Sequence, residues 1–426
     1  MRRAVLDAGM YGVLVPAEDT ERLDLRRLLA AVEAAPPIDV VDVVAAELAE
    51  ALGATRVSLL IANFSGTALN RLSHVTDYDA LSIGRNERME SLRLDGSAYQ
   101  RVLFSQTLDV VPDGDDWLVL VPITERGDAI GILELSLPRH PDTETVDHLV
   151  AAAHALAYVL IASRRYTDLF EWAQRDTPFT VAAEIQRRLL PSSYTAEGGP
   201  FTVAGWLEPA HNAGGDTFDY SIDREYLYLS ITDAMGHSTV AAMLATLTVG
   251  SLRNSRRKPA SPSEQADAAN EVLRTYAKPD QFVTGQIVRI RLADGYAEFV
   301  NAGHPAPYLL REGRATSMTL SSGLPFGAWL SAYETDIVAL KPGDRLLFLT
   351  DGYLERNAAH VDIEGVLAAT VGRHPRQVVQ ELAGTILEAT GGDLRDDATV
   401  LCLDWYGQAG ARNATGGASR ARTTSL

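Results

Sequence analysis

Apolar and polar residues recur with two different periods along this chain of 426 residues, and each period predicts a kind of element. From Val41 to Leu52, apolar residues of one face return every three or four positions, which predicts a helix after Pro36-Pro37. Short apolar runs bounded by polar residues predict strands at 57–63, 68–75, 117–123 and 129–137. The last two enclose a polar turn at Gly127, so we expect them to form a hairpin.

The stretch 143–190 has a helical period for most of its length. The apolar residues with this spacing are Val146, Leu149, Ala153, Leu156 and Leu160. Pro178 interrupts the pattern, and a second helical piece runs to Pro191. We expect an unbroken helical connector over 143–191, which either packs as a spacer or joins two copies of the chain as a homodimer.

Residues 200–405 are rich in strand-like runs separated by a few longer helical stretches. Strands are predicted at 201–208, 226–232, 282–290, 296–303, 306–312, 335–341, 344–350 and 398–405. Helices are predicted at 239–253, 262–277 and 375–389. Strands in this number with few helices predict a β-sandwich with helices packed on its outer faces.

These patterns together predict an α+β protein with two domains. The predicted parts are a lead-in at 1–27, a small α+β domain at 28–165, a strand-rich domain at 192–406 and a tail at 407–426. The last helix of the first domain is expected to run on into the connector. The tail lacks apolar residues and is expected to be disordered.

Charge and cysteine content restrict the classes of function. The net charge is −18 and the pI is about 4.9, which argues against a nucleic-acid partner. Cys402 is the single cysteine, which excludes an intramolecular disulfide and a cysteine-based zinc cluster and favours a reducing, cytoplasmic location. No apolar span of about 18 residues and no apolar leader is found, so we expect no membrane segment.

Acidic residues stand where several predicted strands begin or end. They are Asp216 and Asp219 in AGGDTFDY, Asp233 after LYLSIT, Asp351 after LLFLT, and Asp396 and Asp397 before ATVLCL. A single aspartate-glycine pair after a strand is ordinarily a turn. Several such sites far apart in the sequence indicate instead strand ends that the fold brings together.

Carboxylates gathered at one point repel one another unless a cation neutralises them. Oxygen ligands without nearby cysteine or paired histidine favour Mg²⁺ or Mn²⁺ over Zn²⁺. Small residues beside the acids would let a backbone oxygen approach the same ion. Two such ions bridged by a carboxylate suit the hydrolysis of phosphoesters, which is the chemistry that these residues predict.

Residues 180–405 resemble the bacterial protein phosphatase 2C-like family, and within it the sporulation stage II E-type branch that regulates sigma-factor switches. The motifs occur in order: EIQRRLLP at 184–191, PAHNAGGD at 209–216, ITDAMGHS at 231–238, NAGHPAPYLL at 301–310, GLPFGA at 323–328, LKPGDRLLFLTDGYLE at 340–355 and DDATVLCL at 396–403. The resemblance implies a β-sandwich flanked by helices, two bound Mn²⁺ or Mg²⁺ ions, and removal of phosphate from phosphoserine or phosphothreonine. The substrate that it implies is a phosphorylated anti-sigma-factor antagonist.

Carried over residue by residue, the resemblance makes Asp233 the carboxylate that bridges the two ions, with the carbonyl of Ala234 as a neighbouring ligand. Asp351 and Asp396 would complete the shell of the second ion. Asp396 is preferred to Asp397 because the family's ligand is the first residue of the pair. These three aspartates are therefore the expected catalytic residues.

Three further positions are implied less directly by the resemblance. Asp216 would be a ligand, either directly or through water, whereas Asp219 follows a motif in which Thr217 replaces an aromatic residue. Ser238 replaces a glycine that commonly follows the Gly-His pair, and it would stiffen the turn or cap the next helix.

For two histidines and one arginine, the sequence leaves two possible roles each. His237 and His304 lie in family motifs, where each would either donate a proton to the leaving oxygen or hold its loop by hydrogen bonds. His211 has the same alternatives. Arg395, beside the acids, would either contact phosphate or balance the local negative charge.

Residues 28–165 resemble a GAF domain, through the order of the elements and the hairpin GDAIGILELSLP before a long helix. The resemblance implies a sensory module that binds a small ligand or a protein signal, or that dimerises. We expect a signal at this domain to rotate or order the helix that ends in EIQRRLLP and thereby to complete the metal site. The competing hypothesis is a catalytically silent sensor or scaffold that binds a phosphoprotein without turnover.

Overall fold

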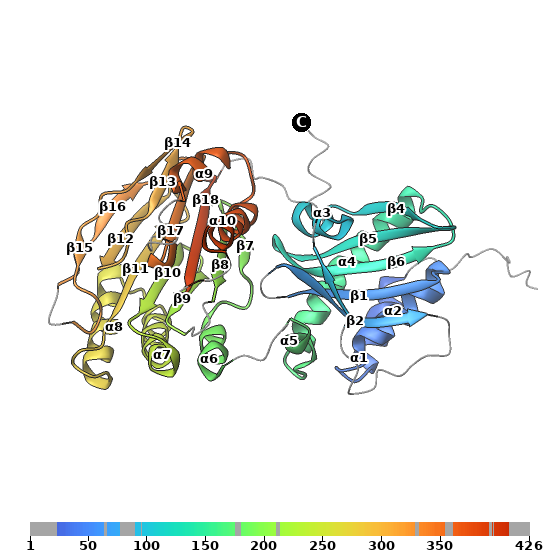
Figure 1. The fold of residues 1–426 in the computed structure, drawn as a ribbon, viewed down its shortest axis with the longest axis horizontal. Helices are drawn as coiled ribbons and strands as arrows, with labels where there is room; N and C mark the ends of the chain where they lie inside the picture. The colour runs from blue at the N-terminus through green and yellow to red at the C-terminus, as the bar shows by residue number, and fades with distance from the viewer. Residues whose placement is uncertain are drawn as a thin grey trace, which may run out of the picture.

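The structure is a computed structural model that describes residues 24–63, 66–76, 90–94, 96–174, 180–209, 214–328, 332–353, 361–391, 394 and 396–408. Two groups of strands and helices follow one another along the chain and lie side by side (Figure 1). The predicted lead-in and most of the predicted tail lie outside the described residues.

The N-terminal group is built on one six-stranded antiparallel sheet with the order β3-β2-β1-β6-β5-β4. Its strands are β1 (Arg56–Ala62), β2 (Ala68–Thr76), β3 (Ser91–Arg93), β4 (Asp109–Asp113), β5 (Asp116–Glu125) and β6 (Asp128–Leu137). The pairing of β1 with β2 and the β5–β6 hairpin confirm two predictions. β1 pairs with β6 as well, so the two predicted hairpins share one sheet.

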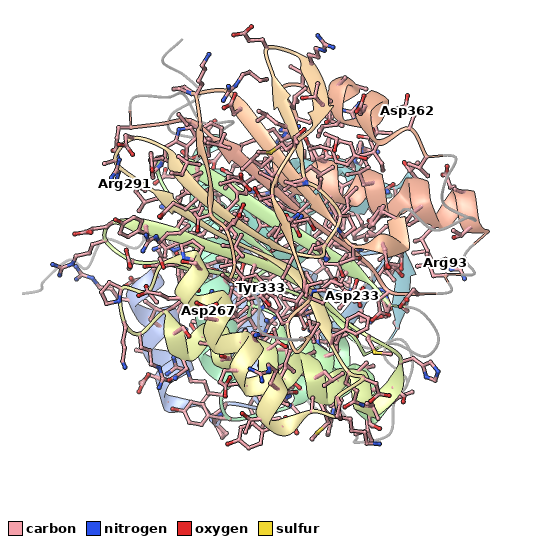
Figure 2. The ribbon with its side chains drawn as sticks, turned by 90° about the vertical axis from the view of Figure 1, so that its left-hand side faces the viewer. Arg93, Asp233, Asp267, Arg291, Tyr333 and Asp362 are labelled. Carbon is pink, nitrogen blue, oxygen red and sulfur yellow. The ribbon has the colours of Figure 1, made fainter. Side chains whose placement is uncertain are left out.

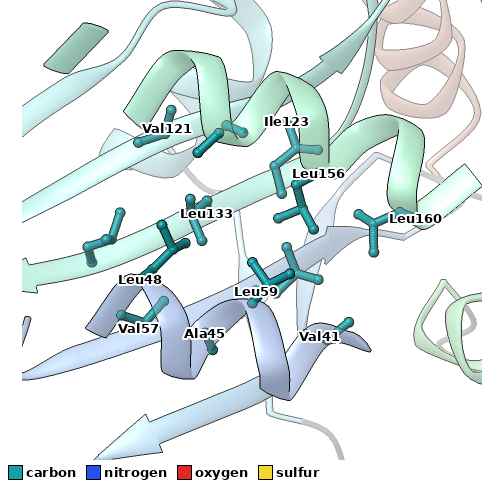
Figure 3. Close-up of a cluster of buried hydrophobic side chains, with 14 of the residues drawn as sticks. Val41, Ala45, Leu48, Val57, Leu59, Val121, Ile123, Leu133, Leu156 and Leu160 are labelled. Atoms are coloured by element: carbon teal, nitrogen blue, oxygen red, sulfur yellow. The ribbon is translucent and has the colours of Figure 1, made fainter. Parts of the chain in front are cut away.

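Helices cover both faces of this sheet. α1 (Leu25–Ala34), α2 (Val40–Leu52) and α4 (Thr143–Ser163) lie on one face, and α3 (Ala98–Ser105) lies on the other. Leu48, Leu133 and Leu156 show how α2, β6 and α4 form a single buried cluster (Figure 3). Removing this apolar surface from water is the main favourable contribution to the stability of the domain.

The predicted connector consists of three separate helices, so the expectation of an unbroken helical run is wrong. They are α4, α5 (Leu169–Ala173) and α6 (Val181–Leu189). α4 ends at Ser163 because its apolar stripe packs on the N-terminal sheet and does not continue beyond it. α6 begins anew at Thr180, whose side chain accepts a hydrogen bond from the backbone N–H of Ala183.

α4 differs from the sequence prediction in a second way. Among the described residues it is the helix that is long and apolar enough to cross a membrane, with 21 residues and a mean hydropathy of 1.5. Its buried Leu149, Ala153 and Leu156 belong to the core of the N-terminal domain, where the helix packs against β5. That position accounts for the buried third of the apolar window.

The C-terminal group is a sandwich of two six-stranded sheets. The first has the order β15-β12-β11-β10-β9, with β16 joined to β12, and the second has the order β14-β13-β17-β18-β8-β7. The strands are β7 (Thr195–Glu197), β8 (Phe201–Glu208), β9 (Asp216–Ile222), β10 (Tyr226–Ala234), β11 (Val283–Arg291), β12 (Tyr296–Ala302), β13 (Tyr308–Arg311), β14 (Arg314–Ser317), β15 (Ser322–Gly323), β16 (Asp336–Ala339), β17 (Asp344–Leu349) and β18 (Ala398–Trp405). Apolar side chains of both sheets meet between them, and the rings of Phe299 and Phe348 stack with centroids 6.5 Å apart.

Two pairs of helices flank the sandwich, as predicted. α7 (Ser238–Ser255) and α8 (Pro262–Tyr276) pack on the first sheet, and α9 (Ile363–Ala369) and α10 (Pro375–Thr390) pack on the second (Figure 1). Ser261 begins α8 with a capping box completed by Glu264. Every strand predicted between 201 and 405 is present, whereas β7, β9, β14, β15 and α9 were not predicted.

Candidate functional site

Two of the predicted acids face each other across the first sheet. Asp216 is the first residue of β9, and it stands directly opposite Asp233 in the antiparallel register with β10. Asp233 is the residue before the end of β10. In Figure 2 it lies well away from Arg291, which occupies the opposite end of the β10–β11 ladder. The site is therefore at one end of the sandwich.

The second sheet brings its acids to the same end. Asp351 follows β17 as the first residue of the short 3-10 helix η1 (Asp351–Tyr353), and Asp396 and Asp397 immediately precede β18. Because β17 and β18 are antiparallel neighbours, the end of one lies beside the start of the other. The charges of all three carboxylates act on Asp233. The fold thus gathers acids that are far apart in the sequence.

Asp216 ties the two sheets together at this point. Its buried Oδ2 accepts hydrogen bonds from Thr350 Oγ1 at 2.7 Å and from Thr399 Oγ1 at 2.6 Å, both from the second sheet and its end. Burial raises the pKa of Asp216 well above its ordinary value, and the neighbouring carboxylates of Asp233 and Asp397 raise it further. The two threonines hold the side chain in place.

The negative charge gathered at this end of the sandwich affects the pKa of Asp233. Burial raises its pKa to about 7, and the nearby charges of Asp351 and Asp396 act in the same direction. A carboxyl group with so high a pKa lies where negative charge is poorly compensated by the protein itself. Such a place attracts cations.

Glycines allow the strand ends to come this close. A Cβ on Gly352 would lie 2.1 Å from the backbone oxygen of Asp397, and one on Gly215 would lie 2.6 Å from the backbone oxygen of Ala234. The expectation was that small residues let a carbonyl approach a ligand. At these two positions they instead let one backbone segment approach another.

The two acids of the Asp-Asp pair have different surroundings. Asp397 is buried, and its Oδ2 accepts from Gln186 Nε2 at 2.6 Å and from the backbone N–H of Gly214 at 3.1 Å. Asp396 is exposed, and its Oδ1 accepts from the backbone N–H of Asp397 at 2.9 Å. The choice of Asp396 over Asp397 as the ligand stays a prediction.

Asp219 serves a structural purpose. It is buried, and its carboxylate pairs with Arg253 Nε at 3.0 Å and with Arg256, both on α7. Arg253 also donates from Nη2 to the backbone oxygen of Leu189 at 2.5 Å. This ion-pair network fixes α7 to β9 and to the end of α6.

His304 is a buried loop residue. Its Nδ1 lies 2.9 Å from Thr284 Oγ1, and Asn301 holds its backbone on both sides, accepting from the N–H at 2.8 Å and donating to the C=O at 2.9 Å. Burial lowers the pKa of His304 to about 3, so its imidazole is neutral at ordinary pH. These contacts favour the loop-holding role over proton transfer.

The structure gives Ser238, in the turn after Asp233, a different role from the predicted helix cap. His237, which is exposed, occupies the N-cap position of α7 without a capping hydrogen bond from its side chain. Ser238 has a φ of +69°, in the left-handed region that favours glycine. It therefore does not cap the helix, and the backbone conformation explains why a glycine would suit this position better. Ala234 is fully buried at the end of β10.

Three side chains of the site were not predicted from the sequence. Two side chains that were predicted lie outside the described residues. His211 and Arg395 are the latter. Thr350 and Thr399 escaped because a threonine in a strand has no signature beyond β-propensity. Gln186 lies in the motif EIQRRLLP, yet only the fold shows that its amide donates to Asp397 and, at 2.9 Å, to the backbone oxygen of Asp216.

The donor chemistry of the site fits a hard divalent cation. The gathered ligands are carboxylate oxygens, and the raised pKa of Asp233 shows the repulsion that a cation would relieve. In the part of the chain that the structure describes, however, no three histidine, cysteine, aspartate or glutamate side chains are grouped so as to hold a metal ion. Asp216 and Asp397 are instead hydrogen-bonded to the protein.

Comparisons with known proteins find similarities to the strand-rich half. Residues 223–406 match the family described as Stage II sporulation protein E, SpoIIE. That segment contains Asp233, Ala234, Asp351 and Asp396, whereas Asp216 lies before it. The phosphoserine phosphatase RsbU of Bacillus subtilis strain 168 is 20% identical over 230 residues, which are 52% of this chain and 68% of that protein.

Solved structures also resemble this part of the chain. The RsbU and RsbW domains of Rv1364c from Mycobacterium tuberculosis align with a TM-score of 0.45 and 22% identity over 51% of this chain and 63% of that one. The chain thus spans under two thirds of that protein. The phosphatase domain of Bacillus subtilis SpoIIE, with a fragment of its regulatory domain, aligns with a TM-score of 0.42 and 14% identity over 71% of this chain and 85% of that one. Residues 223–406, in the C-terminal half of this chain, are therefore similar to the SpoIIE family of protein phosphatase 2C-like domains.

Proposed function

We propose that this protein is a metal-dependent protein serine/threonine phosphatase that acts on a phosphorylated anti-sigma-factor antagonist in the cytoplasm. The observation that carries the proposal is the gathering of Asp233, Asp351 and Asp396 at one end of the sandwich, inside the segment that matches the SpoIIE family. The likeness to the phosphoserine phosphatase RsbU supports the reaction type. It also supports the class of substrate.

In this mechanism Asp233, Asp351, Asp396 and the carbonyl of Ala234 hold two Mn²⁺ or Mg²⁺ ions, with Asp216 as a further ligand. The ions would supply an activated water and neutralise the charge of the phosphate oxygens. Thr350 and Thr399 hold Asp216 at a fixed position opposite Asp233. Asp351 and Asp396 are both exposed, and they mark the side from which a phosphorylated side chain would enter.

The test is hydrolysis of p-nitrophenyl phosphate with Mn²⁺ by the wild type, Asp233→Asn and Asp351→Asn. Because each variant removes a charge that the cation requires, we expect each to lose activity by about 100-fold or more. Asp267→Asn is the matched control, because Asp267 is an exposed acid on α8 of the same domain. It should keep the wild-type rate.

Two outcomes would contradict the proposal. Equal rates in the wild type and both site variants would show that these acids do not support hydrolysis. A wild type that is inactive toward both p-nitrophenyl phosphate and a phosphorylated antagonist protein, yet binds the latter, would support the alternative of a silent scaffold.

We also infer that the N-terminal domain, taken as residues 28–165, is a GAF-like sensory module that controls the phosphatase domain at 192–406. Its six-stranded antiparallel sheet with helices on both faces supports this assignment. The link runs through α6, because Gln186 touches both Asp397 and the backbone of Asp216. A signal that moves α6 would therefore change the acid cluster directly. A homodimer formed through the helices of segment 143–191 stays part of this proposal.

A further inference from the structure

The turn of the β5–β6 hairpin touches the phosphatase domain. Arg376 of α10 donates to the backbone oxygens of Gly127 and Phe104, the latter at 2.7 Å. Asp128 Oδ2 accepts from Ser193 Oγ at 2.8 Å and from the backbone N–H of Tyr194 at 3.3 Å. α10 and β7 face the N-terminal domain in Figure 1.

The two domains approach each other closely at two glycines of this interface. A Cβ on Gly127 would lie 2.9 Å from the side chain of Glu197, and one on Gly66 would lie 2.7 Å from the ring of Trp206. Both glycines also have positive φ, so a side chain is disfavoured there on two grounds.

A cavity of about 110 Å³ lies beside these contacts, and both domains line it. The N-terminal domain contributes Asn63, Asp128 and Arg164, and the phosphatase side contributes Arg187, Arg376 and Gln380. Three guanidinium groups therefore meet one carboxylate in its wall. The lining has an excess of positive charge.

Two of these guanidinium groups are incompletely paired. The buried Nε atoms of Arg164 and Arg376 have no hydrogen-bond partner, and Arg376 is only 4% exposed. Among the described residues neither arginine lies within ion-pair distance of a carboxylate. Burial lowers the pKa of Arg164, and it lowers that of Arg376 to about 10, which reflects how poorly the protein alone compensates the two charges.

A hydrogen-bond acceptor faces the same cavity. The buried Oε1 of Gln380 has no donor. A single ligand that pairs with these three atoms would accept from two guanidinium groups and donate one O–H to Gln380. Monohydrogen phosphate has this combination at neutral pH, whereas sulfate and dicarboxylates have no proton to donate.

We propose that the cavity between the two domains is a binding site for inorganic phosphate, held by Arg164, Arg376 and Gln380. The volume of about 110 Å³ suits a small ion better than a nucleotide. Because residues of both domains bind the ion, its presence ties the domains together. Arg187 in the same wall is the neighbour of Gln186, so an occupied site also restrains the part of α6 that contacts the acid cluster.

The experiment is isothermal titration of the full chain with sodium phosphate at constant ionic strength, with and without a chelator. We expect one saturable site in both conditions. Arg164→Gln should weaken binding about tenfold or more, since it removes a charged donor whose buried Nε has no hydrogen-bond partner among the described residues. Arg101→Gln, which removes an exposed arginine of α3 in the same domain, should leave the affinity unchanged.

Gln380→Leu is a second variant, and it tests the O–H donor. The wild type should prefer phosphate to sulfate, and this variant should lose the preference. Equal affinities in Arg164→Gln and Arg101→Gln would overturn the proposal, as would the absence of saturable binding. Binding that disappears with the chelator would assign the phosphate to the acid cluster instead, which also overturns it. None of these outcomes depends on whether the protein hydrolyses phosphoesters.

Discussion

His304 illustrates how a buried polar residue couples the fold to pH. Its imidazole is neutral in the folded protein, with a pKa of about 3, whereas in the unfolded chain a histidine has a pKa of about 6.5. Below pH 6.5 the unfolded state therefore binds a proton that the folded state does not. The stability associated with this residue is present above pH 6.5 and is lost as the pH falls toward 3.

We expect this difference to lower the free energy of unfolding by about 2 kcal/mol between pH 7 and pH 5. His304→Asn keeps a polar group near Thr284 but cannot titrate, so the variant should lose about 2 kcal/mol less over the same interval. Urea unfolding followed by tryptophan fluorescence at both pH values measures the difference. The same pH dependence in both proteins would show that His304 is not buried as described.

Individual site residues differ in how far the sequence reveals them. Asp233 and Asp351 stand out because each ends an apolar run beside small residues. The partners of Asp216 do not, because Thr350 and Thr399 are recognised only once the two sheets are packed. Hydrogen bonds between distant segments depend on tertiary structure that no local pattern encodes.

At the scale of elements, period-two and period-3.6 patterns predict the strands and helices that bury one face. β9 escaped because its residues Asp216–Ile222 carry two acids and few apolar side chains, although the acids are themselves buried by hydrogen bonds and ion pairs. The connector was misjudged for a related reason. Its apolar period is real, but it serves the N-terminal sheet, and a sequence pattern does not say what a face packs against.

The contact between the start of η1 and the residues before β18 yields a prediction about these element ends. In Gly352→Ala the new methyl group would meet the backbone oxygen of Asp397, so one of the two segments must move. We expect a loss of stability of about 1–3 kcal/mol and a fall in phosphatase rate of roughly 100-fold, because both segments carry site acids.

Gly384→Ala is the matched control for that substitution. Gly384 lies in α10 with nothing within 4 Å of the new Cβ, so the change should stabilise the helix by up to about 1 kcal/mol and leave the rate unaltered. Thermal unfolding and p-nitrophenyl phosphate hydrolysis measure both quantities. A Gly352→Ala variant that behaves like the control would contradict the described approach of the two segments.

At the scale of the whole molecule, α6 is the helix of the connector that contacts the acid cluster. Arg188 pairs with Glu171 of α5 at 3.2 Å, and Gln186 on the same helix donates to Asp397. If α6 moved relative to the N-terminal domain, the side chain of Gln186 would therefore move the acid that it contacts, Asp397.

We expect Gln186→Leu to raise the Mn²⁺ concentration for half-maximal activity about tenfold, because Asp397 and the Asp216 backbone lose a donor that orients them. Deleting residues 1–165 should raise it as well, through loss of the contacts that position α6. Val181→Ala, at an exposed position of the same helix, is the control. Unchanged metal dependence in both the deletion and Gln186→Leu would argue against control through α6.

The order of strands in the second sheet has a consequence for biosynthesis. β18 lies between β17 and β8, in the interior of that sheet, yet it follows every other strand of the sandwich in the sequence. It also carries Thr399, and Asp396 and Asp397 come just before it. While the ribosome still holds residues 396–405, the sheet has a gap at its centre and the acid cluster lacks two members. The acid cluster of a nascent chain is therefore complete only after this segment emerges from the ribosome.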